Sequence, residues 1–354
     1  MLLSLPFSNR AVITPKWLPE IGPTRQVFIT PGGMGDSVMF SAVSENYNRI
    51  KREKLFVSTL YPEVFQNNPT VTTVSPRFRK LLLKNRQWEA DLLRRRIKPI
   101  SAKYFTMVFN EDKRIRQLFP EGYLVSRLCQ RVGLAGKISL IPKIYFKKNE
   151  KKFGSFFTSN QVAVQSKAKT PSKDWGHKKM QMIITALRDQ LNFIQIGVRS
   201  DPLLEGALDL RGLPLRATAA VLYHSVLFCG MVGGLMHLAR AVGCRSVVAW
   251  PGNEPEDKVG YRGNIHVKSK YECRMCAENQ LSIFSGDKCP AEYRCITEIP
   301  LEGFIYAIRE SFKDGKLDME DETVTIAADP AQDCLELYHW KAMVDGHRRR
   351  TECE

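Results

Sequence analysis

Two glycine-rich segments, about 200 residues apart, carry residue types that can hold a phosphate group. The first follows the apolar residues 26–30 and reads Thr30-Pro31-Gly32-Gly33-Met34-Gly35-Asp36-Ser37. The second follows residues 225–229 and reads Gly230-Met231-Val232-Gly233-Gly234-Leu235-Met236-His237. A glycine turn between a strand and a helix leaves backbone N–H groups at the positive end of the helix dipole. Either segment alone is better interpreted as an ordinary tight turn, and their recurrence is what favours a phosphate site.

Asp36 closes the first segment at the predicted start of a helix. The simplest interpretation is an N-cap, because a carboxylate there accepts orphan backbone N–H groups. A carboxylate at the edge of a ligand site is also suited to act as a general base for a substrate hydroxyl. The first segment lacks G-x-G-x-x-G spacing and the chain has no G-x-x-x-x-G-K-[ST] sequence, so neither dinucleotide nor P-loop binding is indicated.

Lys173 follows the apolar strand predicted at residues 161–165, within Ser172-Lys173-Asp174-Trp175. A lysine at the carboxyl end of a parallel strand can meet a diphosphate. The alternative is a surface lysine among several neighbours.

Four cysteines within 23 residues predict a structural metal site, and they are Cys273, Cys276, Cys289 and Cys295. Four thiolates suit tetrahedral zinc or a mononuclear iron. Disulfides are the alternative, but the chain lacks secretory features and its other cysteines show no pairing pattern. A nucleic-acid-binding zinc ribbon has similar spacing, but this loop is embedded late in an α/β sequence.

The chain of 354 residues carries a net charge of +16, and residues 77–103 hold ten Lys or Arg against two acids. Nucleic acid, an anionic membrane surface and phosphate-bearing small molecules would all fit this charge. The basic segment has few aromatic residues, which argues against a single-strand nucleic-acid binder. No apolar run approaches the length of a membrane span, and the N-terminus is a poor signal peptide, so we expect a cytoplasmic protein.

Strand and helix patterns alternate along the chain, and this alternation predicts parallel sheets covered by helices. In the first half the strands fall at residues 26–30, 55–59 and 104–110 and the helices at 37–53 and 124–132. In the second half the strands fall at residues 161–165, 193–197, 225–229 and 246–250 and the helices at 178–191, 215–223 and 301–312. We expect two doubly wound domains, residues 1–150 and 151–312, joined by a hinge at 143–152 and facing each other across a cleft that holds the ligand. The tail, 313–354, is expected to be peripheral, with a helix near 335–343.

These segments together resemble glycosyltransferase family 9, the lipopolysaccharide heptosyltransferase-like enzymes. The matching motifs are Gly33-Met34-Gly35-Asp36, Lys173-Asp174-Trp175, Gly234-Leu235-Met236-His237-Leu238-Ala239 and Cys295-Ile296. The resemblance covers most of residues 25–312. It implies a GT-B fold of two Rossmann-like domains, with the donor in the C-terminal one. It also implies inverting transfer of a heptose-like sugar from a nucleotide diphosphate, usually ADP-heptose, to a glycan or lipid-linked acceptor.

The resemblance also implies residue roles. Asp36 would deprotonate the acceptor hydroxyl, Lys173 would neutralise the leaving diphosphate, and Asp201 would contact the nucleotide. The expected donor-binding set is Gly33, Met34, Gly35, Lys173, Asp201, Gly233, Gly234, Leu235, Met236 and His237. No catalytic metal is expected, in agreement with a structural role for the cysteines.

Val232 is a departure from the family, which typically has an acidic residue two places before the glycine of Gly-Leu-Met-His. This departure leaves open a catalytically inactive protein that binds a nucleotide sugar or an acidic polymer. A third hypothesis, a basic metal-ribbon protein that binds nucleic acid, is supported only by the net charge and the cysteines. With the leading interpretation, the basic segment would face acceptor phosphates or the inner face of an anionic membrane, and no specific nucleic acid is expected.

Overall fold

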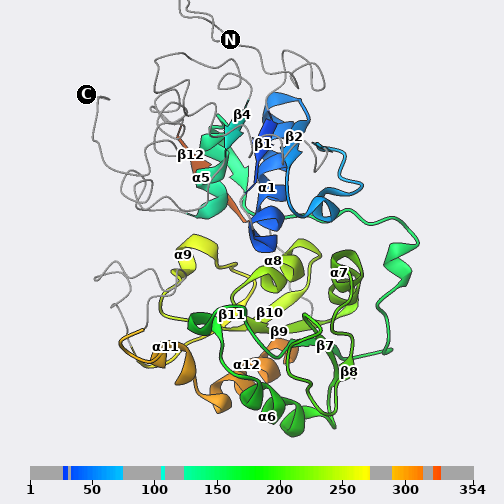
Figure 1. Cartoon of the computed structure of the whole chain (residues 1–354), viewed down its shortest axis with the longest axis vertical. Helices are drawn as coiled ribbons and strands as arrows, with labels where there is room; N and C mark the ends of the chain where they lie inside the picture. Colours follow the sequence, from blue (N-terminus) through cyan, green and yellow to red (C-terminus); the bar gives the residue numbers. More distant parts are fainter. Residues whose placement is uncertain are drawn as a thin grey trace, which may run out of the picture.

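The computed structural model describes residues 27–30, 33–74, 105–107, 123–271, 289–313 and 322–327. The basic segment 77–103, Cys273, Cys276 and the helix predicted near 335–343 lie outside the described residues. In the described part, two α/β units lie one above the other along the long axis, and one end of α1 meets α8 where the units join (Figure 1).

The N-terminal unit is built on a four-stranded parallel sheet in the order β3-β2-β1-β4. Its strands are β1 (Val27–Ile29), β2 (Leu55–Ser58), β3 (Val71–Thr73) and β4 (Phe105–Met107). The short 3₁₀ turn η2 (Pro62–Phe65) follows β2, and the described helices of this unit are α1 (Met34–Lys51) and α5 (Leu124–Arg131). Residues 37–44 of α1 are all buried, because this helix contacts its own sheet, α5 and a helix of the second unit.

The C-terminal unit is built on a six-stranded sheet in the order β11-β10-β9-β6-β7-β8, and every pair in it is parallel. Its strands are β6 (Gln161–Gln165), β7 (Asn192–Ile196), β8 (Leu208–Asp209), β9 (Leu227–Met231), β10 (Arg245–Ala249) and β11 (Ile265–Val267). Its helices are α6 (His177–Leu187), α7 (Leu215–His224), α8 (Gly234–Ala241), α9 (Glu256–Val259), α11 (Arg294–Thr297) and α12 (Leu301–Lys313). The strand order reverses direction beside β6 and β9, which is where parallel sheets of this kind bind ligands.

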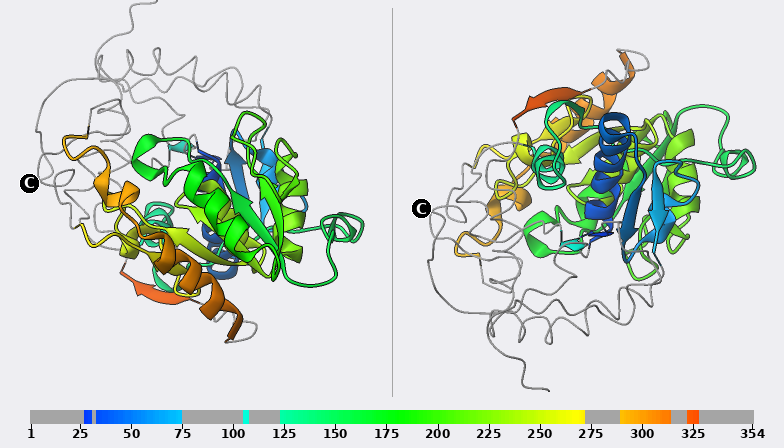
Figure 2. Two further views of the ribbon diagram at one scale, coloured as in Figure 1. Left: turned by 90° about the horizontal axis from the view of Figure 1, so that it is seen from below. Right: turned by 90° about the horizontal axis from the view of Figure 1, so that it is seen from above.

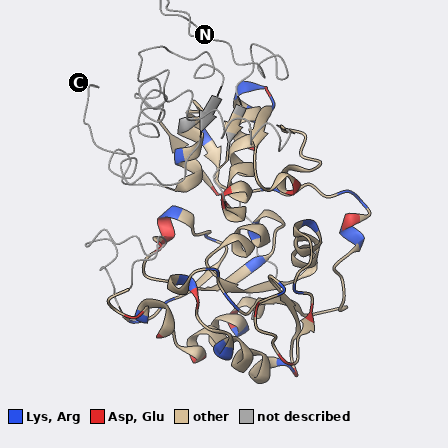
Figure 3. Ribbon diagram, viewed as in Figure 1, with Lys and Arg blue, Asp and Glu red and all other residues tan. Residues whose placement is uncertain are grey.

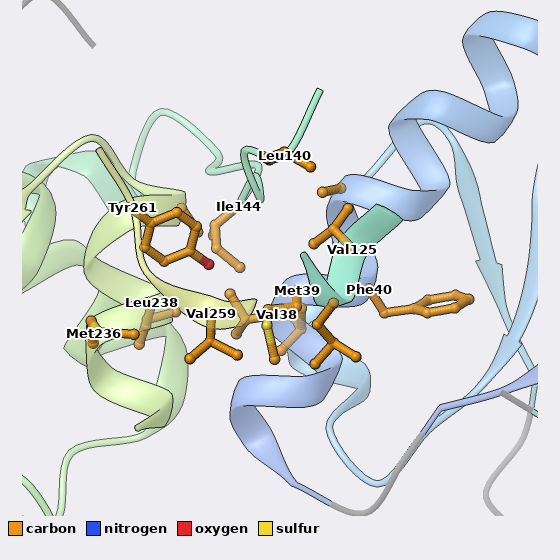
Figure 4. Packing of buried hydrophobic residues seen from close by; sticks show 14 of the residues in the cluster. Val38, Met39, Phe40, Val125, Leu140, Ile144, Met236, Leu238, Val259 and Tyr261 are labelled. Carbon is orange, nitrogen blue, oxygen red and sulfur yellow. The ribbon is translucent and has the colours of Figure 1, made fainter. Parts of the chain in front are cut away.

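Helices cover both faces of this second sheet. In β6, Val162 and Val164 pack with α6 and α12, whereas Ala163 lies in the cluster that contains α7 and α8. This alternation is the two-residue period of a strand buried on both sides. The α7–α8 cluster continues into the N-terminal unit, where Val38 and Met39 of α1 lie near Leu238 (Figure 4). The two units therefore share a continuous apolar core.

Two segments outside the sheets connect the units. The first runs from β5 (Gly136–Ser139) to β6 and contains the short 3₁₀ turn η3 (Glu150–Lys152), and it passes along one side of the molecule (Figures 1 and 2). The second is β12 (Thr323–Ile326), which pairs antiparallel with β5 although it comes late in the sequence. Figure 1 shows β12 in the N-terminal unit beside α5. The tail was expected to be peripheral; residues 322–327 are instead built into the fold, because β5 offers them a partner strand.

The described strands fall close to the predicted ones. The predicted helix at 178–191 ends earlier, at Leu187, and α1 begins at Met34, three residues before the predicted start. Five strands were not predicted, namely β3, β5, β8, β11 and β12. Each has four residues or fewer, too short for its alternation to stand out from the flanking loop.

Candidate active site at the junction of the two units

The two glycine segments, far apart in sequence, meet in the structure. A Cβ atom added at Gly35 would lie 2.9 Å from Cδ2 of His237 and 3.3 Å from Cα of Gly234. A Cβ atom added at Gly234 would overlap the methyl group of Met34. Gly35 and Gly234 thus let the first turns of α1 and α8 approach more closely than any side chain would permit. The segments predicted from sequence to share a site are in direct contact.

Gly233 has different surroundings. A Cβ atom added there has no described atom within 4 Å, and Gly233 to Leu235 are half-buried rather than enclosed. The N–H of His237 donates to the carbonyl of Gly233 at 3.2 Å, so it is used within the helix. The N–H groups of Gly234, Leu235 and Met236 come before that first helical bond and have no acceptor inside the helix. These three groups, and not that of His237, are the ones at which α8 can hold an anion.

Asp36 lies in the first turn of α1, and its Oδ2 accepts the N–H of Gly33 at 3.0 Å. Gly33 occupies the N-cap position, so Asp36 is the third helical residue reaching back to the cap and is not the cap itself. The side chain is half-buried and adjoins the contact between α1 and α8. A carboxylate has about four lone-pair sites, so the hydrogen bond from Gly33 does not prevent Asp36 from accepting a proton from a substrate.

Lys173 ends the 3₁₀ turn η4 (Pro171–Lys173), which follows β6. Its Nζ lies 2.9 Å from Oε2 of Glu254, and the side chains are 19% and 8% exposed. Lys258 Nζ approaches the other oxygen, Oε1, at 3.7 Å. Lys173 is therefore held in an ion pair with a buried carboxylate, unlike a solvated surface lysine.

Glu254 was not predicted from the sequence. It follows β10 in the turn Pro251-Gly252-Asn253-Glu254-Pro255, at the same carboxyl edge of the sheet as Lys173. A carboxylate just after a predicted strand was the available signal. Its partner could not be read from the sequence, since the two residues are 81 positions apart.

His237 is buried, and its Nδ1 lies 2.8 Å from the hydroxyl of Tyr261, which is buried as well. Burial, together with the nearby charge of Lys173, lowers the pKa of His237 to about 3. The imidazole is therefore neutral near pH 7 and contributes no positive charge. Lys173 follows β6, and β6 is the neighbour of β9, the strand that leads into α8. Met236 and His237 are both buried, so their side chains face the core, and of the two only the backbone N–H of Met236 belongs to the candidate site.

Asp201 stands after β7, and its Oδ2 accepts the N–H of Val198 at 3.0 Å. Burial raises the pKa of this carboxyl group, while the bond from Val198 and the charges of Lys167 and Arg211 oppose that rise. Because β7 pairs with β6 in parallel, Asp201 lies at the same carboxyl edge of the sheet as the loop that carries Lys173. The hydrogen bond that Asp201 accepts from Val198 stabilises the turn that contains both residues.

Behind α8 lies a second buried ion pair that the sequence did not suggest. Nη2 of Arg240 is 2.9 Å from Oε1 of Glu322, and these side chains are 2% and 7% exposed. The same carboxylate oxygen accepts the N–H of Arg262 at 3.0 Å, and the carbonyl of Glu322 accepts the N–H of Leu140 at 2.7 Å. The guanidinium of Arg240 lies over the ring of Tyr261. The segment that carries β12 is thus joined to the helix of the second glycine segment.

Val232 is 3% exposed and packs in the shared core. Two of the four predicted metal ligands are described. Cys289 is half-buried and its Sγ accepts the N–H of Tyr293 at 3.3 Å, whereas Cys295 is buried in α11. Neither forms a disulfide. Within the described ranges no three side chains of His, Cys, Asp or Glu converge as a metal site requires.

Three solved structures resemble this chain. The ADP-heptose lipopolysaccharide heptosyltransferase II of E. coli is 13% identical, with a TM-score of 0.57, over 83% of this chain and 100% of that one. A family 9 glycosyl transferase from Veillonella parvula is 12% identical, with a TM-score of 0.58, over 83% and 98%. The iron-containing heptosyltransferase TibC, in complex with ADP-D-β-D-heptose, is 14% identical, with a TM-score of 0.60, over 82% and 77%. No family model matches the sequence, and no curated protein matches it significantly.

These likenesses, with the two parallel sheets and their helices, show that the chain has the α/β fold of GT-B glycosyltransferases, as predicted. Among the residues that the structure describes, no helix combines the length and apolarity needed to cross a bilayer.

Proposed function

We propose that this protein is a glycosyltransferase that moves a sugar from a nucleotide diphosphate donor to a glycan or lipid-linked acceptor. The observation that carries the proposal is the contact between the first turns of α1 and α8. It places Asp36 beside the start of α8, where the first N–H groups have no acceptor inside the helix, and Lys173 follows the neighbouring strand β6. Two of the similar structures are named for ADP-heptose, so a heptose-like sugar on ADP is the donor we propose.

In this reaction the acceptor oxygen attacks the anomeric carbon from the face opposite the diphosphate, and the bond from that carbon to the phosphate oxygen breaks. The proton of the acceptor hydroxyl passes to Asp36. The nucleotide diphosphate leaves with the bonding electrons, and its developing charge is stabilised by Lys173 and by the N–H groups at the start of α8. The configuration at the anomeric carbon is inverted. No step requires a metal ion.

Asp201 is proposed to contact the nucleotide, because it lies at the same sheet edge as Lys173. The acceptor is proposed to be an anionic or membrane-linked glycan of lipopolysaccharide biosynthesis, at the inner face of the membrane, because the net charge of +16 favours phosphate-bearing partners. Figure 3 shows charged residues of both signs at α9 and η3, so the charges of the described part are mixed there.

The cysteine set is proposed to hold a structural zinc or iron ion. The N–H donated to Cys289 suits a thiolate, since metal-bound sulfurs are commonly stabilised by such bonds. A structure similar to this chain is described as iron-containing. Metal analysis of the purified protein should give close to one equivalent of zinc or iron. Four titratable free thiols without metal would exclude the site.

Asp36→Asn tests the catalytic assignment. The amide still accepts the N–H of Gly33, so the helix start should be kept while the proton acceptor is lost. Thermal stabilisation by a panel of nucleotide sugars should first identify the donor. The variant should then lose transfer, by about 100-fold or more, and should retain nucleotide binding. Asp189→Asn, at an exposed position after α6, is the control and should transfer normally. Full transfer by Asp36→Asn would remove Asp36 from its assigned role.

The second candidate is a catalytically inactive protein of the same fold that binds a nucleotide sugar or an acidic polymer. The feature that favours it is Val232, an apolar residue buried where heptosyltransferase-like enzymes typically carry an acid. Calorimetric titration with ADP- and GDP-sugars, followed by a product assay, separates the two. Tight binding with no turnover by the wild-type protein supports this second candidate.

A further inference from the structure

The pair formed by Lys173 and Glu254 has a geometry that the proposed function does not by itself require. Glu254 is 8% exposed and is one carboxylate between two ammonium groups, Lys173 at 2.9 Å and Lys258 at 3.7 Å. A buried charge is costly unless it is paired, so the two lysines fix where this carboxylate stands. The carboxylate in turn fixes Lys173, whose four-carbon side chain has many rotamers when unpaired.

Glu254 is itself firmly placed by its backbone. Its carbonyl accepts the indole N–H of the buried Trp250 at 2.6 Å, and its N–H donates to the carbonyl of Pro251 at 3.4 Å. The ring of Trp250 is buried beneath this turn and packs on His266. The turn after β10 is therefore a rigid support for the carboxylate, and it lies one strand away from β9, which leads into α8.

A second observation shows that the polar groups of this turn are not all satisfied within the described part of the protein. Both polar atoms of the Asn253 side chain are buried and have no hydrogen-bond partner among the described residues. Buried amides are seldom left unpaired, because each unmade bond costs stability. Asn253 comes directly before Glu254, so the unsatisfied amide and the ion pair occupy the same turn.

We infer that Glu254 is a positioning residue for the leaving group, which holds the ammonium of Lys173 where the donor diphosphate departs. This inference rests on the proposed glycosyl transfer. When the diphosphate enters, Lys173 contacts both the phosphate and Glu254, so the ammonium is directed without a search through its rotamers. Because the carboxylate also reduces the local positive charge, its removal should affect turnover more than it affects nucleotide affinity.

The test is Glu254→Gln, which keeps the shape of the side chain and removes its charge. We expect kcat to fall by about 10-fold or more, because the ammonium of Lys173 is no longer held in one orientation. The Kd for ADP should stay within about 3-fold of the wild-type value or decrease. Glu254→Asp restores the charge and should recover part of kcat. Glu256→Gln is the matched control, because Glu256 pairs with His266 and Lys268 outside the site and should leave kcat unchanged.

A readout independent of turnover uses the modification of Lys173. Reductive methylation, followed by mass spectrometry of the peptide, should be slow in the wild-type protein and faster in Glu254→Gln, with no change at Lys173 in Glu256→Gln. Unchanged kcat and unchanged labelling of Lys173 in Glu254→Gln would overturn the inference, as would equal effects in Glu256→Gln. Should Glu254→Gln fail to fold, Glu254→Asp is compared in the same way, and its shorter reach should give an intermediate rate of labelling.

The two proposals fail differently. If the wild-type protein binds no nucleotide and transfers no sugar, the proposed function is wrong, whatever the labelling shows. If wild-type transfer is found and Glu254→Gln has a normal kcat, only the positioning role is wrong.

Discussion

The guanidinium of Arg216, on α7, donates to both carboxylate oxygens of Glu150, at 2.5 Å to Oε1 and 2.8 Å to Oε2. It also donates to the carbonyls of Glu63, at 2.9 Å, and Tyr145, at 2.7 Å. Residues 143–152 were expected to be a hinge. Arg216 binds that segment and the η2 turn of the N-terminal unit to a helix of the C-terminal unit. Arg216 holds the pKa of Glu150 down at about 2, so the pair stays ionised throughout the physiological range.

Arg216→Met should destabilise the protein by about 3 kcal/mol, because Glu150 and several carbonyls lose their donor in a partly buried setting. Chemical denaturation at pH 7 measures the loss. Arg199→Met is the matched control, since Arg199 is 74% exposed in its pair with Asp209 and should cost less than about 0.5 kcal/mol. Equal free energies of unfolding for the two variants would contradict a structural role for Arg216 between the units.

Arg240→Met should cost about 3 to 5 kcal/mol, because it leaves the buried carboxylate of Glu322 without its guanidinium. Glu322→Gln should cost less, since the amide still accepts the N–H of Arg262. Denaturant titrations of both variants check this order. The exposed pair of Arg294 and Glu298 offers a control, and Arg294→Met should change the free energy of unfolding by less than about 0.5 kcal/mol. A small effect of Arg240→Met would show that residues 322–327 add little to the fold.

The free energy of unfolding should fall as the pH is lowered from about 6.5. His237 should account for a distinct part of this dependence of stability on pH. Its pKa is about 3 in the folded protein and returns to its ordinary value on unfolding, so the unfolded chain binds the proton more readily. The contribution of His237 is fully present above its ordinary pKa and is lost at about 1.4 kcal/mol per pH unit below it.

Free energies of unfolding at pH 7, 6 and 5 test this prediction, and His237→Gln should have a shallower slope than wild type. Burial also lowers the pKa of His266, so His266 likewise makes stability fall as the pH is lowered. His266→Gln is therefore the comparison variant, because it keeps the contribution of His237 to the pH dependence. A slope in His237→Gln equal to that of wild type would show that the imidazole is not neutral and buried as described.

Gly35→Ala and Gly233→Ala should separate packing from ligand binding. The methyl group at Gly35 would press on His237 at 2.9 Å, so we expect a loss of about 1 to 3 kcal/mol in stability.

The methyl group at Gly233 meets no described atom within 4 Å, and the φ of Gly233, 166°, is extended backbone that alanine adopts. Gly233→Ala should therefore fold normally and bind ADP at least about 10-fold more weakly, because the methyl group would occupy open space at the start of α8 that the proposed phosphates would fill. Thermal melts and calorimetry measure the two effects; normal ADP affinity in Gly233→Ala would place the phosphates elsewhere.

The sequence alone determined the α/β class, the two sheets and most of their strands, because buried parallel strands are short apolar runs bounded by glycine and polar turns. It also indicated that the segments at Gly33 and Gly233 belong to one site, and the structure brings them into contact. The strands and each glycine segment are local features, since each depends on residues within a few positions of one another.

The tertiary structure decided which atoms are available there. It turned Met236 and His237 into the core, used the N–H of His237 inside α8, and left the amides of Gly234 to Met236 without an acceptor inside that helix. It also paired Lys173 with Glu254 and Arg240 with Glu322, over separations of 81 and 82 residues. Ion pairs between residues so far apart in sequence depend on the order of the strands in the sheet and on how the two units pack. A local pattern of residue types does not predict that order.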